Sequence, residues 1–196
     1  MRLSDTTPAG QVVLRPLKET DETAWLRLRS ENHRWLGPWE ATVPATDTPT
    51  QPTTFSHYVR ALHRAAQQGT ALPFVIELDG KLVGQITVTG ITYGSLRSAV
   101  IGYWISRHVA GRGIVPTAVA LATDHCFTTL GLHRMEINIR PGNERSLRVV
   151  AKLGFRDEGI RQRYLHIEGD WRDHRTFALT SSEVPDGLLA RWKKRQ

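Results

Sequence analysis

The sequence predicts a mixed α/β or α+β fold, and three observations lead to this prediction. Runs of β-branched residues joined by tight turns are typical of antiparallel strands. Apolar residues at spacings of three and four indicate helices, and the two kinds of segment alternate in the second half of the chain. A chain of 196 residues buries one core well and is short for two full domains, so we expect a single domain over residues 1–196.

The N-terminal part predicts one strand and two helices. Residues 12–17 (VVLRPL) predict the first strand, and residues 22–32 predict a helix that Thr20 or Asp21 can cap. Residues 55–68 predict a second helix, because their apolar positions recur at helical spacing.

Three further strands are expected in the middle of the chain. Residues 73–91 read as a hairpin that turns at Asp79 and Gly80, since Asp-Gly between two β-branched runs is a strong hairpin signal. Residues 97–106 (RSAVIGYWIS) predict the next strand.

The second half alternates helices with strands. From Val115 the apolar residues Val119, Ala122, Cys126 and Leu130 predict a helix with one buried stripe. The rest of this half predicts one strand, one helix and a final hairpin. The strand covers 134–139, the helix covers 143–155 and is closed by Gly154, and the hairpin strands cover 161–168 and 171–179.

Residues 33–54 predict a long loop, with four prolines and with Trp35 and Trp39 beside Glu40. Loops longer than about 12 to 15 residues in a compact domain are usually functional or disordered, and the tryptophans argue against disorder. We therefore expect this segment to form a wall on the substrate side, with a purely structural lid as the alternative.

Charge and composition limit the kind of protein. The formal net charge is +7, and residues 99–196 hold 16 Lys and Arg against 10 Asp and Glu. Such a surplus attracts an anionic ligand or a ribonucleoprotein surface, although a solvated basic face without a partner remains open. The lone cysteine, Cys126, and the scattered histidines predict no disulfide and no metal site. Without a long apolar run or a recognisable signal, we expect a cytoplasmic protein that does not enter a membrane.

The stretch HVAGRGIVPTAV, residues 108–119, places Gly111 and Gly113 directly before a predicted helix. The first N–H groups of a helix lack partners, and glycines let a ligand approach the backbone, so an anion such as a phosphate can bind the amides of residues 111–115. A plain tight turn is the alternative. The spacing excludes a P-loop, and Pro116 excludes the dinucleotide fingerprint.

This stretch and three others resemble a known family. YWISRHVAGRGIV and NERSLRVVAKLGF are similar to the acetyl-CoA-binding core of the GNAT N-acetyltransferases. ENHRWLGPWE and YLHIEGDWRDHRTFAL further resemble the ribosomal-protein alanine N-acetyltransferases of the RimJ/RimL type. The resemblance covers residues 12–179 and leaves a tail over 180–196. It implies a mostly antiparallel twisted sheet that splays at strands 4 and 5, flanked by about four helices.

The resemblance also implies how acetyl-CoA would bind. Its phosphates would contact the turn and the helix start, and its pantetheine arm would pair with the open end of the strand and reach Asn143. The residues so implied are Tyr103, Trp104, Ile105, Gly111, Arg112, Gly113, Ile114, Val115 and Asn143. Two positions depart from the family signature, since Ala110 replaces Arg or Gln and Val115 replaces a small residue, which puts the strength of cofactor binding in doubt.

Catalysis needs a proton for the departing thiolate and a neutral amine. By resemblance Ser146, or a water that it holds, supplies the proton, because Val150 stands where some relatives have a Tyr. The alternative is that Asn143 only caps the helix and Ser146 is an ordinary residue of its first turn. Glu40 is the first candidate for the base, with Glu136, Glu168 or a water as alternatives.

Three aromatic residues are candidates for the wall of the acceptor slot. They are Trp35, Trp39 and Tyr164, and loop anchoring in the core is the alternative role for them.

The leading hypothesis is acetyl transfer from acetyl-CoA to the N-terminus of a protein. The acceptor would be a ribosomal protein with a small first residue, and the basic second half of a monomer or homodimer could contact the ribosome. A small-amine acetyltransferase should have a more acidic and more enclosed pocket, and a non-catalytic ribosome or RNA-binding factor would keep the fold without binding the cofactor.

Overall fold

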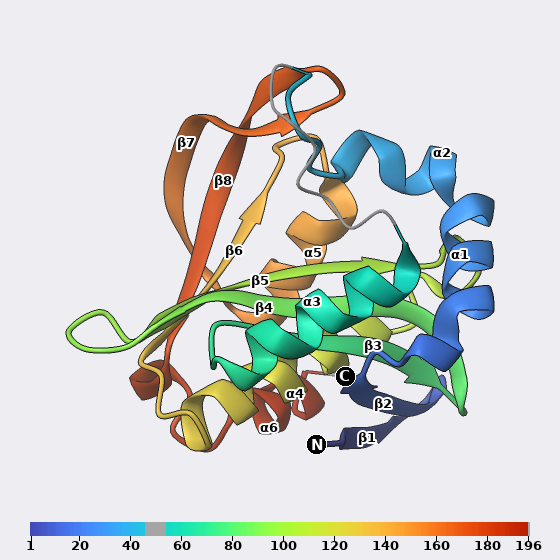
Figure 1. The fold of residues 1–196 in the computed structure, drawn as a ribbon. Coiled ribbons are helices and arrows are strands. Elements are labelled where there is room, and N and C mark those ends of the chain that lie inside the picture. The colour runs from blue at the N-terminus through green and yellow to red at the C-terminus, as the bar shows by residue number, and fades with distance from the viewer. Residues whose placement is uncertain (46–53, 196) are drawn as a thin grey trace.

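The computed structural model describes residues 1–45 and 54–195, and these residues form an eight-stranded sheet of order β1-β2-β3-β4-β5-β6-β8-β7 (Figure 1). The strands are β1 (Leu3–Thr7), β2 (Gly10–Pro16), β3 (Leu72–Leu78), β4 (Lys81–Thr92), β5 (Ser98–Ile105), β6 (Arg134–Ile139), β7 (Arg156–Ile167) and β8 (Asp170–Thr180). All neighbours pair antiparallel except β5 and β6, which run parallel. The predicted mixed fold class is confirmed.

The sheet splays between β5 and β6. The two strands pair only over Ser98–Val100 and Arg134–Glu136, after which β5 continues along β4 to Ile105 and β6 continues along β8 to Ile139. The second half of β5 therefore has one edge without a strand partner in the described chain. The splay was expected at the fourth and fifth strands. It lies at these same two strands, which are labelled β5 and β6 because the unpredicted β1 precedes them.

The α-helices of the described residues cover both faces of the sheet. They are α1 (Glu22–Glu31), α2 (His33–Leu36), α3 (Phe55–Gln67), α4 (Ile114–Thr128), α5 (Glu144–Leu153) and α6 (Leu188–Lys193). Short 3-10 helices occupy Glu19–Asp21, Gly37–Trp39, Arg107–Val109 and Ser181–Glu183. About four helices were expected, and α2 and α6 are the short additions.

Strand β3 shows how the two faces are buried. Phe74 and Ile76 belong to a large core cluster with α4, α5 and α6, whereas Val75 between them packs with Phe55 and Val59 of α3. Because successive side chains of a strand point to opposite faces, α3 and α4 cover opposite sides of the sheet. None of the helices in the described residues is both long and apolar enough to cross a membrane.

The expectation of a single buried stripe on α4 was wrong. Residues Ile114 to Thr123 of this helix are all buried. The sheet covers one side of α4, while α5 and α6 cover the other, so no side of its first ten residues faces solvent. The sequence pattern underestimated burial because α6 was not anticipated.

Other differences concern the ends of elements. Strand β1 was missed because four of its five residues are polar, and its pairing with β2 is what makes it a strand. Strand β7 begins at Arg156, earlier than predicted, because it pairs with β8 from that residue onward. Asp21 is the N-cap residue of α1, but its carboxylate accepts hydrogen bonds from Arg15 and from the Lys18 N–H instead of capping the helix. The predicted loop over 33–54 starts with α2, and its residues 46–53 lie outside the described part.

Candidate functional site

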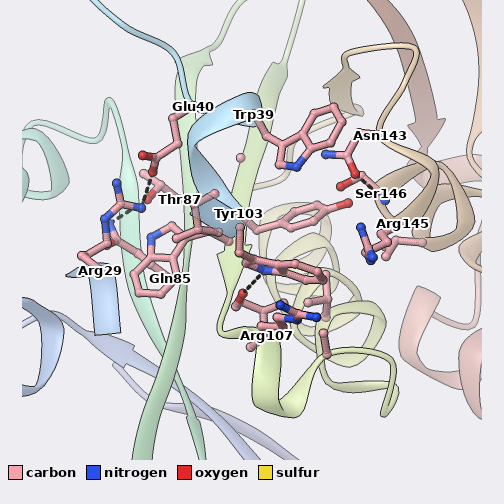
Figure 2. Close-up of a pocket in the computed structure, with 18 of the residues that line it drawn as sticks. Arg29, Trp39, Glu40, Gln85, Thr87, Tyr103, Arg107, Asn143, Arg145 and Ser146 are labelled. Atoms are coloured by element: carbon pink, nitrogen blue, oxygen red, sulfur yellow. Dashed lines mark hydrogen bonds and ion pairs between the residues drawn. The ribbon is translucent and has the colours of Figure 1, made fainter. Parts of the chain in front are cut away.

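A cavity of about 1320 Å³ passes through the splay of the sheet and is partly shown in Figure 2. Residues from both faces of β5 line it, because Gly102 and Trp104 alternate with Tyr103 and Ile105. Twelve of the predicted site residues line this cavity; they are Trp35, Trp39, Glu40, Tyr103, Trp104, Ile105, Gly111, Gly113, Ile114, Val115, Asn143 and Ser146.

One end of the cavity, which we call the phosphate end, is formed by the turn and helix start over residues 111–115, of which all but Arg112 line the cavity. Gly111 and Gly113 have φ angles of 84° and 81°, which side chains other than glycine rarely adopt, and Gly113 is the N-cap of α4. Among the described residues, the N–H groups of residues 111–115 have no hydrogen-bond acceptor. These free donors at a helix start fit an anion such as a phosphate.

The space in front of the turn also fits a bound group. A Cβ added to Gly111 would meet no atom within 4 Å and would extend into open space at the cavity wall. Val115, which replaces a small residue of the family signature, is 8% exposed and packs largely into the core. The residues present therefore suit the diphosphate of coenzyme A.

Helix α5 adds positive charge beside this end. Arg145, Arg148 and Lys152 line the cavity at helical spacings that place them on one face. No carboxylate in the described residues forms a salt bridge with any of the three. Their charge is therefore available to an anionic ligand.

Two hydroxyl groups meet in the middle of the cavity. Asn143 caps α5 by accepting a hydrogen bond of 3.2 Å from the Ser146 N–H, which orients the start of the helix. Figure 2 shows the Tyr103 hydroxyl pointing toward Ser146.

The Tyr103 hydroxyl is buried, and its pKa is raised above the ordinary value. Burial raises the pKa of Tyr103 to about 12, and the nearby Ser146 opposes this effect only in part. The hydroxyl nevertheless has no well-aligned hydrogen-bond partner among the described residues. It is a protonated donor that a bound group in the cavity could satisfy.

The other end of the cavity, which we call the acceptor end, is formed by Trp25, Arg29, Glu40, Tyr58, Gln85 and Trp104. Gln85 is held from both sides, since it accepts from the Trp25 indole at 2.9 Å and donates to the Tyr58 hydroxyl at 2.9 Å. Burial raises the pKa of Tyr58, while the hydrogen bond from Gln85 lowers it.

Arg29 lies at the centre of the acceptor end. Its guanidinium lies 5.5 Å from the Trp25 ring and 5.2 Å from the Trp104 ring, and it forms an ion pair with Glu40. In Figure 2 this pair and Ser146 lie on opposite sides of Tyr103. Glu40 is the only carboxylate among the described residues that line the cavity.

Trp35 and Trp39 connect the segment after α1 to the cavity. The Trp35 indole donates to the Ile105 carbonyl at 3.0 Å, and Arg145 lies 4.3 Å from its ring. Trp39 approaches Gly142 and stacks with Arg140. Both tryptophans thus anchor the segment and line the cavity.

Several candidates lie outside the cavity. Arg112 lines a smaller neighbouring hollow, and Tyr164 packs edge-on against His174, so neither touches the cavity wall. Of the alternative bases, Glu136 pairs with Arg134 and Arg161, and Glu168 pairs with Arg140. This geometry gives no support to a contact between Tyr164 and the acceptor.

Sequence reasoning missed four residues of the acceptor end: Trp25, Arg29, Tyr58 and Gln85. Trp25 and Tyr58 lie within the helices predicted over 22–32 and 55–68, where a large apolar side chain is expected to pack in the core, and no local pattern marks Gln85 or Arg29.

Comparisons with known proteins show the family to which the chain is related. A family model described as an acetyltransferase (GNAT) domain matches residues 11–156. The chain is 32% identical over 175 residues to the probable N-acetyltransferase YjcK of Bacillus subtilis, covering 88% of this chain and 95% of that protein. It is 30% identical over 180 residues to the [Ribosomal protein uS5]-alanine N-acetyltransferase of Escherichia coli, covering 90% and 91%. The solved structure of Mycobacterium smegmatis RimJ in complex with CoA-disulfide is similar with a TM-score of 0.91 and 40% identity, covering 99% of this chain and 94% of that one.

Proposed function

The chain belongs to the GNAT acetyltransferase family and is an acetyl-CoA-dependent N-acetyltransferase, and from this premise we propose that it acetylates the N-terminal α-amino group of a protein. The proposed acceptor is a ribosomal protein with a small first residue. This proposal is supported by the similarity to the uS5-alanine enzyme and by the charge of the cavity.

The charge of the cavity is the observation that carries the choice of acceptor. Glu40, the lone cavity carboxylate of the described residues, is already paired with Arg29, so the acceptor end offers no free carboxylate. A polyamine carries several positive charges that would have no counter-ion here, whereas a peptide N-terminus brings a single ammonium group followed by peptide carbonyls. The acidic pocket expected for a small-amine enzyme is absent from the described residues.

The residues of the cavity have different proposed roles, according to where they lie in it. The free N–H groups of the phosphate end hold the diphosphate, and the open edge of β5 and Asn143 orient the pantetheine arm. Acetyl-CoA supplies the activated acetyl group. Ser146, beside the protonated Tyr103 hydroxyl, holds the proton that the leaving sulfur needs.

An α-amino acceptor also fits the scarcity of bases. An α-amino group has a pKa of about 7.7 to 8.0, so about a tenth of it is neutral at pH 7, whereas a lysine with a pKa of about 10.4 is almost fully protonated. The enzyme therefore needs only a modest proton acceptor. Glu40 is the proposed one, because it lies at the acceptor end and faces the cavity.

The test is release of free thiol from acetyl-CoA with different acceptors. We expect turnover with peptides that begin with Ala or Ser and little with the same peptides acetylated at the N-terminus or with spermidine. Turnover with spermidine alone would replace this proposal with a small-amine function. Mass spectrometry of the peptide would distinguish acetylation at the N-terminus from acetylation at a lysine.

A further inference from the structure

The chain beyond β8 folds back onto the helix that begins at the phosphate end. Helix α6 packs against α4 through Leu188 and Trp192, which are 0% and 5% exposed. The Asp124 carboxylate on α4 accepts hydrogen bonds from the Leu188 and Leu189 N–H groups at 2.6 and 3.0 Å. The position of α6 is thus set by α4.

A chain of hydrogen bonds runs from α6 to the phosphate end. The Trp192 indole donates to the Thr117 hydroxyl at 2.9 Å, and this hydroxyl donates to the Gly113 carbonyl at 3.0 Å. The Thr117 N–H also donates to the same carbonyl at 3.2 Å. The Gly113 carbonyl is therefore held by two donors on the helix side.

The Trp192 ring also lies behind the turn itself. A Cβ built on Gly113 would lie 3.6 Å from the Trp192 ring, and no other atom comes within 4 Å. The ring therefore backs Gly113 on the side toward α6. The Gly113 carbonyl is thus fixed on the side of α6, while Gly111, Gly113, Ile114 and Val115 line the cavity.

We propose that Thr117 and Trp192 are positioning residues that hold the phosphate end in the conformation that binds the diphosphate of acetyl-CoA. This inference rests on the proposed role of residues 111–115. Glycines lose more conformational freedom on ordering than other residues, so a turn built on Gly111 and Gly113 needs support from its surroundings. A loop that is already ordered before binding gives its ligand a higher affinity, because binding then no longer includes the entropy cost of ordering the loop.

The first test removes the Thr117 hydroxyl. Thr117→Val keeps the size of the side chain and removes both hydrogen bonds of the hydroxyl, and calorimetry should show a Kd for CoA about 3- to 10-fold weaker. Thr117→Ser, the matched variant that keeps the hydroxyl, should bind CoA within about twofold of the wild type. Equal binding by both variants and the wild type would overturn the inference.

The second test asks whether the two residues act together. Trp192→Phe keeps a ring and removes the indole N–H, so it should weaken CoA binding by about 2- to 5-fold. In the double variant Thr117→Val/Trp192→Phe the two losses should not multiply, because both break the same chain. Losses that multiply would contradict a shared chain.

A positioning role must be separated from a loss of stability. Val12→Ala, a core substitution in β2 outside the cavity wall, serves as a control that lowers Tm and removes no hydrogen bond of this chain. The Thr117 and Trp192 variants should raise KM for acetyl-CoA while KM for the acceptor peptide stays the same. An effect on CoA binding by Val12→Ala as large as theirs would reduce their role to stability.

CoA binding by the wild type and by Gly111→Trp distinguishes a failure of the proposed phosphate end from a failure of the positioning role of Thr117 and Trp192. If CoA does not bind the wild type, or still binds tightly when Gly111 is replaced by Trp, the phosphate end is wrongly assigned. If that substitution abolishes binding but Thr117→Val does not weaken it, only the positioning role fails.

Discussion

The two ends of the cavity differ in the chemical groups that they offer to a ligand. The phosphate end offers main-chain N–H groups that have no acceptor among the described residues, and it lies beside Arg145, Arg148 and Lys152, which have no counter-ion there. The acceptor end consists of side chains that already satisfy one another, with Gln85 held by Trp25 and Tyr58, and Arg29 paired with Glu40.

This difference indicates what each end can discriminate. An array of unpaired donors binds an anion strongly wherever the chain presents one. A network of satisfied side chains gains little from an arbitrary ligand and rejects one that leaves a buried polar group unpaired. If the proposed assignments hold, the phosphate end would serve affinity and the acceptor end would serve specificity.

The largest expected effect comes from filling the phosphate end. Gly111→Trp places a large side chain in the space of the ligand and should weaken CoA binding by at least about 100-fold, measured by calorimetry. Gly69→Trp is the matched control, because Gly69 has a φ of 69°, open space around its Cβ and no place in the cavity wall. Equal loss in both variants would mean that backbone strain is responsible.

The next largest expected effect concerns Ser146, whose hydroxyl lies near that of Tyr103 between the two ends. Ser146→Ala should lower kcat about 100-fold and leave the Kd for CoA within about twofold, because it removes a proton donor and no phosphate contact. A variant that retains full kcat would end the proposed role of Ser146.

The neighbouring Tyr103 predicts a pH dependence. Because burial raises its folded-state pKa to about 12, from an ordinary value of 10.0, the group keeps its proton at neutral pH. Its stabilising contribution is complete below about pH 10 and is lost as the pH rises toward 12. Tyr103→Phe should therefore leave the shape of the kcat profile between about pH 6 and 9 unchanged. An alkaline limb that moves in this variant would show that Tyr103 titrates in the reaction.

A smaller effect should separate the acceptor end from the phosphate end. Glu40→Gln should lower kcat/KM for the peptide about 10-fold without changing the Kd for CoA, since it removes a proton acceptor and the partner of Arg29. Glu168→Gln is the control, because Glu168 also pairs with an arginine but lies outside the cavity wall. The reverse ranking would make Glu168 the better candidate for the base.

The smallest effect concerns the charge on α5. Arg148→Gln should weaken CoA binding about 3-fold at low salt and less at about 0.5 M salt, where exposed charges are screened. Arg64→Gln, an exposed cation of α3 outside the cavity wall, should leave binding unchanged. An effect independent of salt would indicate a direct contact instead of a general field.

Much of the fold followed from local pattern. The hairpin turn at Asp79 and Gly80, with φ angles of 48° and 77°, and the helix end at Gly154, with a φ of 76°, lie where the residue types placed them. The elements that pattern did not predict, β1, α2 and α6, are short. Strand β1 is polar and pairs with the adjacent β2, so its hydrophobic pattern is weak although its partner is near. Helix α6 packs on α4 and is bonded to Asp124 across 64 positions, which a local window of sequence does not contain.

The sequence by itself determined the phosphate end. A left-handed φ at Gly111 and Gly113 and the free amides of a helix start are local properties, so a dozen residues suffice to encode them. Tertiary structure alone decided the acceptor end and the support behind the turn. Trp25 meets Gln85 across 60 positions and Trp192 meets Thr117 across 75. Such contacts form only when the sheet brings distant segments together, because side-chain hydrogen bonds and ring stacking act over a few ångströms.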